Sequence, residues 1–329
     1  MMLHKHRPTQ YLLTSLLVVL LLEGCQKAQE VEVSIRRCAD MPQPCASAVG
    51  FSINGEGYVF GGRTGDKSRC NHLYKYTPST DTWTEISGVP LKARVNAMAQ
   101  VAGDYVYIGL GFNGYVYRDS CYLRDFWRYN PTTNEWSRLA DFPNTNTIRP
   151  VTYTVGDCIY VTYGSGPGFS REINIYDIKT DTWSQLPYNS KRAWSGHGKV
   201  GATCQGRQFI GGGFNTRNID QWYEMDLEHD TWTERTAIPH GARTLATCTA
   251  NSRYVYVMGG RYWGGDLTTG HLYGDILRYS PETDSWEACG TMPFGEAENL
   301  VSFTIDEHVY FGLGEDMDGN VHNQLYCIE

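Results

Sequence analysis

The sequence predicts an all-β fold in which six repeated antiparallel sheets close into a ring. Five tryptophans recur at intervals of 47 to 54 residues, at positions 83, 136, 183, 232 and 286. Six phrases rich in β-branched and aromatic residues end in glycine, and no stretch keeps a helical period over three turns. A repeat of about 50 residues predicts units that bury their apolar faces only by stacking on one another.

Each repeat contains two hairpins. The outer hairpin ends with the tryptophan strand, in the copies LYKYTPSTDTW, FWRYNPTTNEW, INIYDIKTDTW, WYEMDLEHDTW and ILRYSPETDSW. The inner hairpin ends with the glycine phrase, in the copies YVFGG (58–62), YVYIGLG (105–111), IYVTYG (159–164), QFIGGG (208–213), YVYVMGG (254–260) and VYFGLG (309–314). Two hairpins make a four-stranded antiparallel blade, and six blades stacked around an axis make a six-bladed β-propeller.

The two ends of the chain predict how the ring closes. The sixth glycine phrase is followed only by NQLYCIE, a third strand without a tryptophan strand after it. The phrase VSIRRCADMP at 33–42 has the pattern of a fourth strand, with Ile35 at the tryptophan position. We therefore expect the N-terminal and C-terminal strands to pair in the last blade, which removes the open edge of the ring.

A double glycine, then tyrosine, then tryptophan at this spacing resembles the kelch motif. The resemblance covers roughly residues 31–329. It implies a propeller whose loops crowd one mouth of a central channel, where such proteins usually bind their ligands.

The N-terminus has the pattern of an export signal. Lys5 and Arg7 precede the uncharged run YLLTSLLVVLLL from Tyr11 to Leu22, which is too short to favour a spanning helix. The phrase LLEGC resembles the lipobox of bacterial lipoproteins and predicts lipid attachment at Cys25. We expect a lipoprotein signal peptide at 1–24, a short tether at 25–30 and the propeller at 31–329. The expected location is a bacterial membrane, on its periplasmic or cell-surface side; an ordinary cleaved signal peptide is the alternative.

Composition narrows the partners and the chemistry. The net charge of −8 argues against a nucleic-acid partner, which needs a basic field. There is no CxxC pair, so the cysteine spacing does not match a zinc site, and we expect neither metal nor cofactor.

Besides Cys25 the chain has nine cysteines, an odd number, so at least one thiol should be unpaired. Two disulfides are consistent with the predicted topology: Cys70 with Cys121 in the equivalent loops of consecutive blades, and Cys38 with Cys327 at the closing strands. We expect Cys158, Cys204 and Cys248 to pack as small apolar side chains.

Basic residues recur where the innermost strands begin. Counting back 15 or 16 residues from each glycine phrase reaches Arg94, Arg149 and Arg243, with His197 nearby in the fourth blade. Arg192 lies slightly earlier in its loop. If these side chains converge at the mouth, they would bind the carboxylate or sulfate of an acidic sugar. In the alternative, each arginine bonds loop carbonyls or the carboxylates of a neighbouring blade.

Aromatic residues gather in two of the loops that join the second and third strands. The candidates for stacking on the apolar faces of sugar rings are Tyr115, Tyr117, Tyr262 and Trp263. The alternative is that they cover the ends of the blades.

Two classes of function are consistent with this pattern. The first is a membrane-anchored, non-catalytic module that binds a glycan or a protein partner at the mouth. The second is an enzyme. The resemblance to galactose oxidase implies a seven-bladed ring with copper, and this chain predicts six blades and no copper constellation. The resemblance to the exported N-acetylneuraminate epimerases implies a six-bladed sugar epimerase or mutarotase, for which Glu296 or Glu298 near Arg243 is the candidate acid or base.

Overall fold

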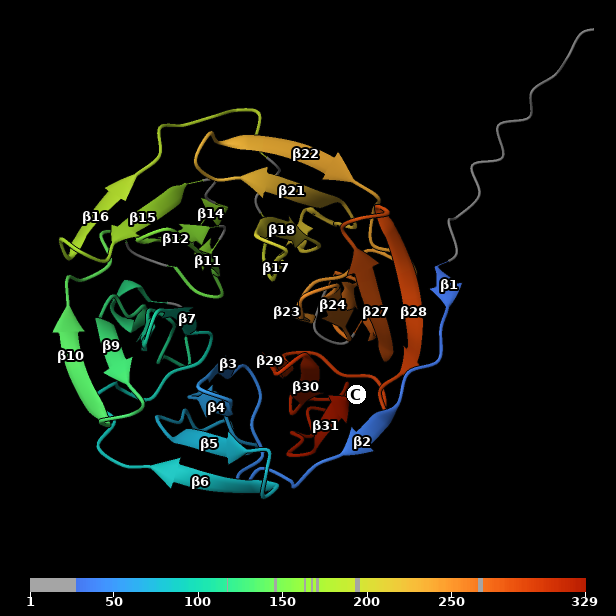
Figure 1. The fold of residues 1–329 in the computed structure, drawn as a ribbon, viewed down its shortest axis with the longest axis horizontal. Helices are drawn as coiled ribbons and strands as arrows, with labels where there is room; N and C mark the ends of the chain where they lie inside the picture. The colour runs from blue at the N-terminus through green and yellow to red at the C-terminus, as the bar shows by residue number, and fades with distance from the viewer. Residues whose placement is uncertain are drawn as a thin grey trace, which may run out of the picture.

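The propeller has six blades. The computed structural model describes residues 28–116, 118–144, 147–162, 164–166, 168–169, 172–192, 196–265 and 269–329. Within these residues, six antiparallel four-stranded sheets surround a central axis, as Figure 1 shows. In the first five blades the first strand in the sequence lies innermost and the last lies outermost. The predicted all-β, six-bladed propeller is therefore confirmed.

Blades 1 to 3 follow the order of the sequence. Their strands are β3 (Val49–Ile53), β4 (Glu56–Phe60), β5 (Leu73–Thr77) and β6 (Thr82–Ile86); β7 (Met98–Ala102), β8 (Tyr105–Gly109), β9 (Phe126–Asn130) and β10 (Glu135–Leu139); β11 (Val151–Val155), β12 (Cys158–Thr162), β15 (Ile173–Asp177) and β16 (Thr182–Gln185). A small hairpin of β13 (Ser165–Gly166) and β14 (Gly168–Phe169) rises from blade 3.

Blades 4 to 6 complete the circle. Their strands are β17 (Val200–Cys204), β18 (Arg207–Gly211), β21 (Trp222–Asp226) and β22 (Thr231–Arg235); β23 (Thr247–Ala250), β24 (Val255–Met258), β27 (Asp275–Ser280) and β28 (Ser285–Thr291); β29 (Val301–Ile305), β30 (His308–Gly312), β31 (Leu325–Ile328) and β2 (Ile35–Arg37). Blades 4 and 5 carry further hairpins: β19 (Phe214–Asn215) with β20 (Arg217–Asn218), and β25 (Arg261–Trp263) with β26 (Gly270–Leu272).

The two ends of the chain meet in blade 6, as the sequence predicts. Strand β2 pairs antiparallel with β31, and Ile35 lies opposite Ile328. The chain then leaves β2 for blade 1, so this pairing joins the first and last segments of the ring (Figure 1).

The segment before β2 is bound to the outer rim. Strand β1 (Gln29–Glu30) pairs parallel with β28, and the Val31 amide donates to the Ala288 carbonyl at 2.9 Å. Part of the predicted tether is therefore a fifth strand of blade 5. The described residues contain one short 3-10 helix, η1 (Asp119–Cys121), and no helix long and apolar enough to cross a membrane.

A repeated latch explains why tyrosine, aspartate and tryptophan recur in the outer hairpins. In blade 1 the Tyr76 hydroxyl donates to Asp81, whose carboxylate also accepts the Ala39 amide of the preceding blade at 2.8 Å. The Trp83 indole nitrogen donates back to the Ala39 carbonyl. Equivalent contacts occur in blades 3 and 5, so each latch ties one blade to its predecessor.

Blade 4 keeps the latch with a different donor. Its outer hairpin has Met225 where the other copies have tyrosine, so no hydroxyl reaches the turn aspartate Asp230. The buried Arg192 takes that place, with two hydrogen bonds to the Asp230 carboxylate at 2.8 and 2.9 Å. This contact explains the arginine at that point in the loop.

Two further arginines clamp blades 2 and 5 internally. Arg94 and Arg243 are both fully buried. Arg94 holds Asp125 with two hydrogen bonds of 2.8 and 2.7 Å and also donates to the Leu110 carbonyl. Arg243 holds Asp275 in the same way and stacks over the Tyr273 ring at 4.1 Å. Each clamp ties the start of the innermost strand to the start of the third strand.

All nine cysteines in the described residues are free thiols, and neither considered disulfide is formed. Cys38 donates its amide to the Leu325 carbonyl, whereas Cys327 lies opposite Arg36, so the two thiols are not directly opposed. Cys121 packs beside Phe112 in blade 2, and Cys70 is buried in blade 1. Cys204 is buried, as expected, while Cys158 and Cys248 are half-buried beside apolar clusters.

Replacing a clamp arginine should destabilise the propeller. Arg243→Ala would leave the largely buried Asp275 without its partner, at a cost of about 3 kcal/mol in the free energy of unfolding. Urea denaturation measures this difference. The matched control is Arg253→Ala in the exposed β23–β24 turn, which should change stability by less than about 0.5 kcal/mol. Equal effects of the two substitutions would contradict the structural role of Arg243.

Candidate functional site

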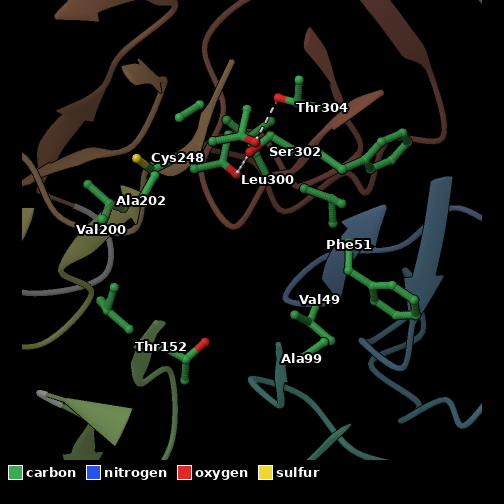
Figure 2. Close-up of a pocket in the computed structure, with 18 of the residues that line it drawn as sticks. Val49, Phe51, Ala99, Thr152, Val200, Ala202, Cys248, Leu300, Ser302 and Thr304 are labelled. Carbon is green, nitrogen blue, oxygen red and sulfur yellow. Dashed lines mark hydrogen bonds between the residues drawn. The ribbon is translucent and has the colours of Figure 1, made fainter. Parts of the chain in front are cut away.

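The central channel of the propeller encloses a hollow with a volume of about 740 Å³. Figure 2 shows side chains of the innermost strands facing this common space, among them Val49, Ala99, Thr152 and Val200. Hydroxyl pairs such as Thr247 with Ser302, at 2.7 Å, line the wall of blades 5 and 6. In the part of the chain that the structure describes, no three His, Cys, Asp or Glu side chains gather as metal ligands would.

One mouth of the channel is framed by six equivalent residues, one from each blade, which we call the mouth ring. They lie two residues before the first residue of each innermost strand and all have a left-handed backbone, with φ between 51° and 64°. Five amides of the ring donate to the carbonyl of the equivalent residue in the preceding blade, at 2.9 to 3.1 Å. The mouth ring consists of Ser47, Asn96, Arg149, Gly198, Leu245 and Asn299.

The basic residues predicted to be equivalent do not occupy equivalent positions relative to the mouth ring. Arg149 belongs to the ring, whereas His197 lies one residue before it and Arg94 and Arg243 lie two residues before it. The miscount has a physical origin in blade 2, where Leu110 takes the left-handed position that a first glycine fills in blade 1. Counting from the visible Gly109 therefore starts one residue early.

Arg149 is the basic residue that spans the mouth. Its Nη2 donates to the Ser47 hydroxyl at 3.1 Å, so the side chain extends from blade 3 to blade 1. His197 of blade 4 lies close enough to be affected: burial, and then the charge of Arg149, lower its pKa to about 4. The His197 ring is therefore neutral near pH 7, and the guanidinium of Arg149 supplies the positive charge at this point.

Two amide side chains of the mouth ring carry buried acceptors. Asn96 Oδ1 and Asn299 Oδ1 are both shielded from solvent and have no hydrogen-bond partner among the described residues. The Nδ2 of Asn299 donates to Glu315 at 2.6 Å, which holds that amide in place. Because a buried acceptor without a partner is costly, both oxygens are suited to the hydroxyls of a ligand or to ordered water.

Two ion pairs connect blades 5, 6 and 1. Glu298 and Glu315 are buried cross-strand neighbours in blade 6. Glu298 accepts from Arg261 of blade 5 at 2.8 Å, and Glu315 pairs with Arg63 of blade 1. The sequence predicts Glu298 near Arg243; in the structure Glu298 forms its ion pair with Arg261, and Arg243 forms its ion pair with Asp275.

Six residues of this region were not predicted from the sequence: Ser47, Asn96, Asn299 and the charged residues Arg63, Arg261 and Glu315. A signal for the last three is present in the sequence, because each directly follows the last glycine of its glycine phrase. In the structure these three residues pair with Ala46, Thr244 and Glu298, each directly before the mouth ring.

The other predicted site residues are dispersed. Arg94, Arg192 and Arg243 lie in the buried ion pairs described above, as in the alternative interpretation. Glu296 is exposed on the loop leading to blade 6 and lies against Gly274. Cys25 falls outside the described residues.

The predicted aromatic residues lie above two sides of the mouth. Tyr115 is 71% exposed and stacks with Arg69 at 4.8 Å. Tyr262 is 41% exposed and stacks on His271, whereas Trp263 is half-buried and fixed by two hydrogen bonds of 2.8 Å to the Asn218 amide. Tyr117 lies outside the described residues.

Comparisons with known proteins agree with this architecture. Kelch-like protein 26 of Danio rerio is 27% identical over 207 residues, which cover 62% of this chain and 33% of that protein. Kelch domain-containing protein 3 of Rattus norvegicus is 25% identical over 194 residues, which cover 53% of this chain and 47% of that protein. The chain therefore spans a third to about half of the length of these relatives.

A solved structure, that of YjhT, has the same fold. It superposes with a TM-score of 0.70 at 17% identity and covers 88% of this chain and 96% of its own. The family model described as the KLHDC2/KLHL20/DRC7 Kelch-repeats domain matches residues 25–213, and the Kelch motif model matches residues 242–293. Since the first model matches more than half of the chain, the chain belongs to the kelch-repeat family.

Proposed function

We propose that this kelch propeller is a binding protein that holds an acidic glycan at the mouth ring. The observation that carries the proposal is Arg149, whose guanidinium spans the mouth from blade 3 to Ser47 of blade 1. A planar guanidinium binds a carboxylate or sulfate through two parallel hydrogen bonds. At pH 7 the neutral His197 adds no positive charge beside that of Arg149.

The remainder of the mouth suits the hydroxyl groups of a sugar. The buried oxygens of Asn96 and Asn299 accept hydrogen bonds, and Ser47 can donate or accept one. The exposed ring of Tyr262 and the half-buried ring of Trp263 offer apolar faces above blade 5. Few polar groups among apolar surfaces are typical of small-ligand sites.

A protein partner is the competing ligand, because kelch propellers generally bind proteins. The depth of the site favours the glycan. The channel of about 740 Å³ continues below the mouth ring, so the ring-lining groups face a narrow hollow rather than a broad surface. A protein would reach them only with a single protruding segment.

Removing the Arg149 charge should abolish selective binding of acidic sugars. We expect Arg149→Gln to lower the affinity for an acidic glycan at least tenfold, because the charge-assisted hydrogen bonds are lost. The affinity for a neutral sugar of the same size should change little. A glycan array of the purified chain identifies the ligand, and calorimetry measures its affinity.

The control is Arg253→Gln, which removes a charge from the exposed turn at the opposite end of the channel. Its affinity for the acidic glycan should equal that of the unchanged chain. An Arg149→Gln variant that retains full affinity would refute this site. Binding of a protein but of no sugar would establish the competing ligand.

A second candidate function is epimerisation of a sugar, as the resemblance to N-acetylneuraminate epimerases suggests. The observation that favours it is Glu298, a buried carboxylate directly before the mouth-ring residue Asn299. Interconversion of anomers needs a group that removes a proton from one oxygen and returns one to another. A carboxylate at the mouth would perform this transfer beside a bound acidic sugar.

NMR exchange between the anomers of N-acetylneuraminate tests the enzymatic candidate. If it holds, the chain accelerates the exchange, and Glu298→Gln lowers the acceleration by on the order of 100-fold while binding persists. Arg253→Gln should leave the rate unchanged. An exchange rate equal to that without protein would eliminate this activity and leave the binding function untouched.

We also infer that the chain is exported and anchored through Cys25. Strand β1 begins four residues after this cysteine, and four extended residues span at most roughly 14 Å. The rim of blade 5 would therefore lie close to the membrane.

Metabolic labelling with palmitate should mark the anchored chain. Cys25→Ser should abolish the label and release the protein from the membrane fraction, since both acyl chains are lost. Cys158→Ser, which keeps the leader intact, should do neither. An unlabelled chain that is still cleaved after residue 24 would indicate an ordinary signal peptide.

A further inference from the structure

The upper edge of blade 1 carries two arginines that face each other across a β-bridge. Arg63 pairs with Ala46 on one side and with Arg69 on the other. The flanking bonds join Thr64 to Ser68 and Cys70 to Gly62, so the two arginines form the non-hydrogen-bonded type of pair. In this type the Cα atoms lie about 4.5 Å apart and the side chains are closest.

Two like charges in such a pair repel each other unless an anion compensates them. Burial, and then the charge of Arg69, lower the pKa of Arg63. Glu315 supplies one compensating carboxylate, but both of its oxygens are already used, one by Arg63 and one by Asn299. Glu298 also favours the charged form of Arg63, whereas among the described residues no hydrogen bond joins Glu298 or Glu315 to Arg69.

Arg69 retains an unused donor. Its Nη1 and Nη2 donate to the carbonyls of Lys67 and Gly114 at 2.8 and 2.9 Å, which fixes the guanidinium. Its Nε is buried and has no acceptor among the described residues. A buried donor without an acceptor costs free energy that a bound oxyanion would recover.

The pair continues the positive charge of Arg149 outward from the channel. Arg149 is bonded to Ser47, the neighbour of Ala46, and Ala46 is hydrogen-bonded to Arg63 at 2.8 and 3.0 Å. Arg149, Arg63 and Arg69 therefore follow one another from the axis across blade 1. We call these three residues the arginine row. Beyond Arg69 lies Tyr115, which is 71% exposed.

We propose that the arginine row is an extended anion site, in which Arg63 and Arg69 bind a second oxyanion beyond the one held by Arg149. The ligand is then an oligosaccharide that carries a carboxylate or sulfate on successive units, with Tyr115 covering its outer sugar. This inference rests on the proposed binding of acidic glycans at the mouth ring and names their class.

Calorimetry with acidic sugars of increasing length tests the arginine row. The probes are galacturonic acid and trigalacturonic acid for carboxylates, with glucose sulfate and a sulfated trisaccharide of glucose for sulfates. We expect a trimer of at least one series to bind at least ten times more tightly than its monomer. Arg69→Gln should remove most of this gain and leave the monomer affinity unchanged.

Two further variants separate the possible outcomes. Arg149→Gln should lower the affinity for monomer and trimer alike, and Arg253→Gln should lower neither affinity. Unchanged monomer binding by Arg69→Gln would also show that this variant is folded. Equal affinities of monomer and trimer in both series, or a trimer insensitive to Arg69→Gln, would overturn the arginine row alone. Failure of every probe to bind would overturn the proposed binding function itself.

Discussion

The chain of backbone hydrogen bonds around the channel mouth is the constraint on which the site depends. Each mouth-ring amide that bonds its neighbour belongs to a residue with a left-handed backbone two residues before an innermost strand. This backbone fixes where the strand begins relative to the axis. A blade shifted by one residue would break its bonds to both neighbours, so the ring sets a common register for all the blades.

The position of a residue relative to the mouth ring then determines where its side chain lies. A mouth-ring residue such as Arg149 reaches over the channel, and the residue before it, such as His197 or Glu298, lies at the edge of the mouth. A residue two positions before the ring, such as Arg243, is buried beneath the loops and clamps its own blade. Arg94 and Arg243 thus share one role and Arg149 has another, because the two clamp arginines lie two positions earlier relative to the mouth ring.

The sequence was sufficient to predict the fold, because the fold depends on features that repeat. Tyrosine, aspartate and tryptophan recur in most outer hairpins since together they form the latch between blades. The closing strand was predictable from Ile35 because a missing strand at one end needs a replacement from the other. None of this required knowledge of the loops.

The site was less predictable, because it depends on positions where the repeat is imperfect. Leu110 and Leu313 adopt φ of 57° where blades 1, 4 and 5 have Gly61, Gly212 and Gly259, and nothing in their composition indicates a left-handed backbone. A count from the first visible glycine therefore starts one residue early in blades 2 and 6. In blade 5 the count starts at Gly259, but Leu245 lies only 14 residues earlier, so a count of 16 passes the mouth ring and reaches Arg243. Arg192 depends on another irregularity of the repeat, since its hydrogen bonds to Asp230 replace that of a tyrosine that blade 4 lacks. The loss of tyrosine in the outer hairpin of blade 4 is thus compensated by an arginine that lies 38 residues before Asp230.

The residues of the mouth ring differ in the backbone strain that they carry. Gly198 shows that glycine is compatible with the mouth-ring position, because glycine adopts this left-handed backbone without strain. Ser47, Arg149 and Leu245 nevertheless adopt it, at a cost on the order of 1 kcal/mol each in the folded state. Asparagine tolerates the left-handed region well, so Asn96 and Asn299 carry little of that cost. Arg149 carries it in full, and the side chain retained by that strain is the one that spans the channel.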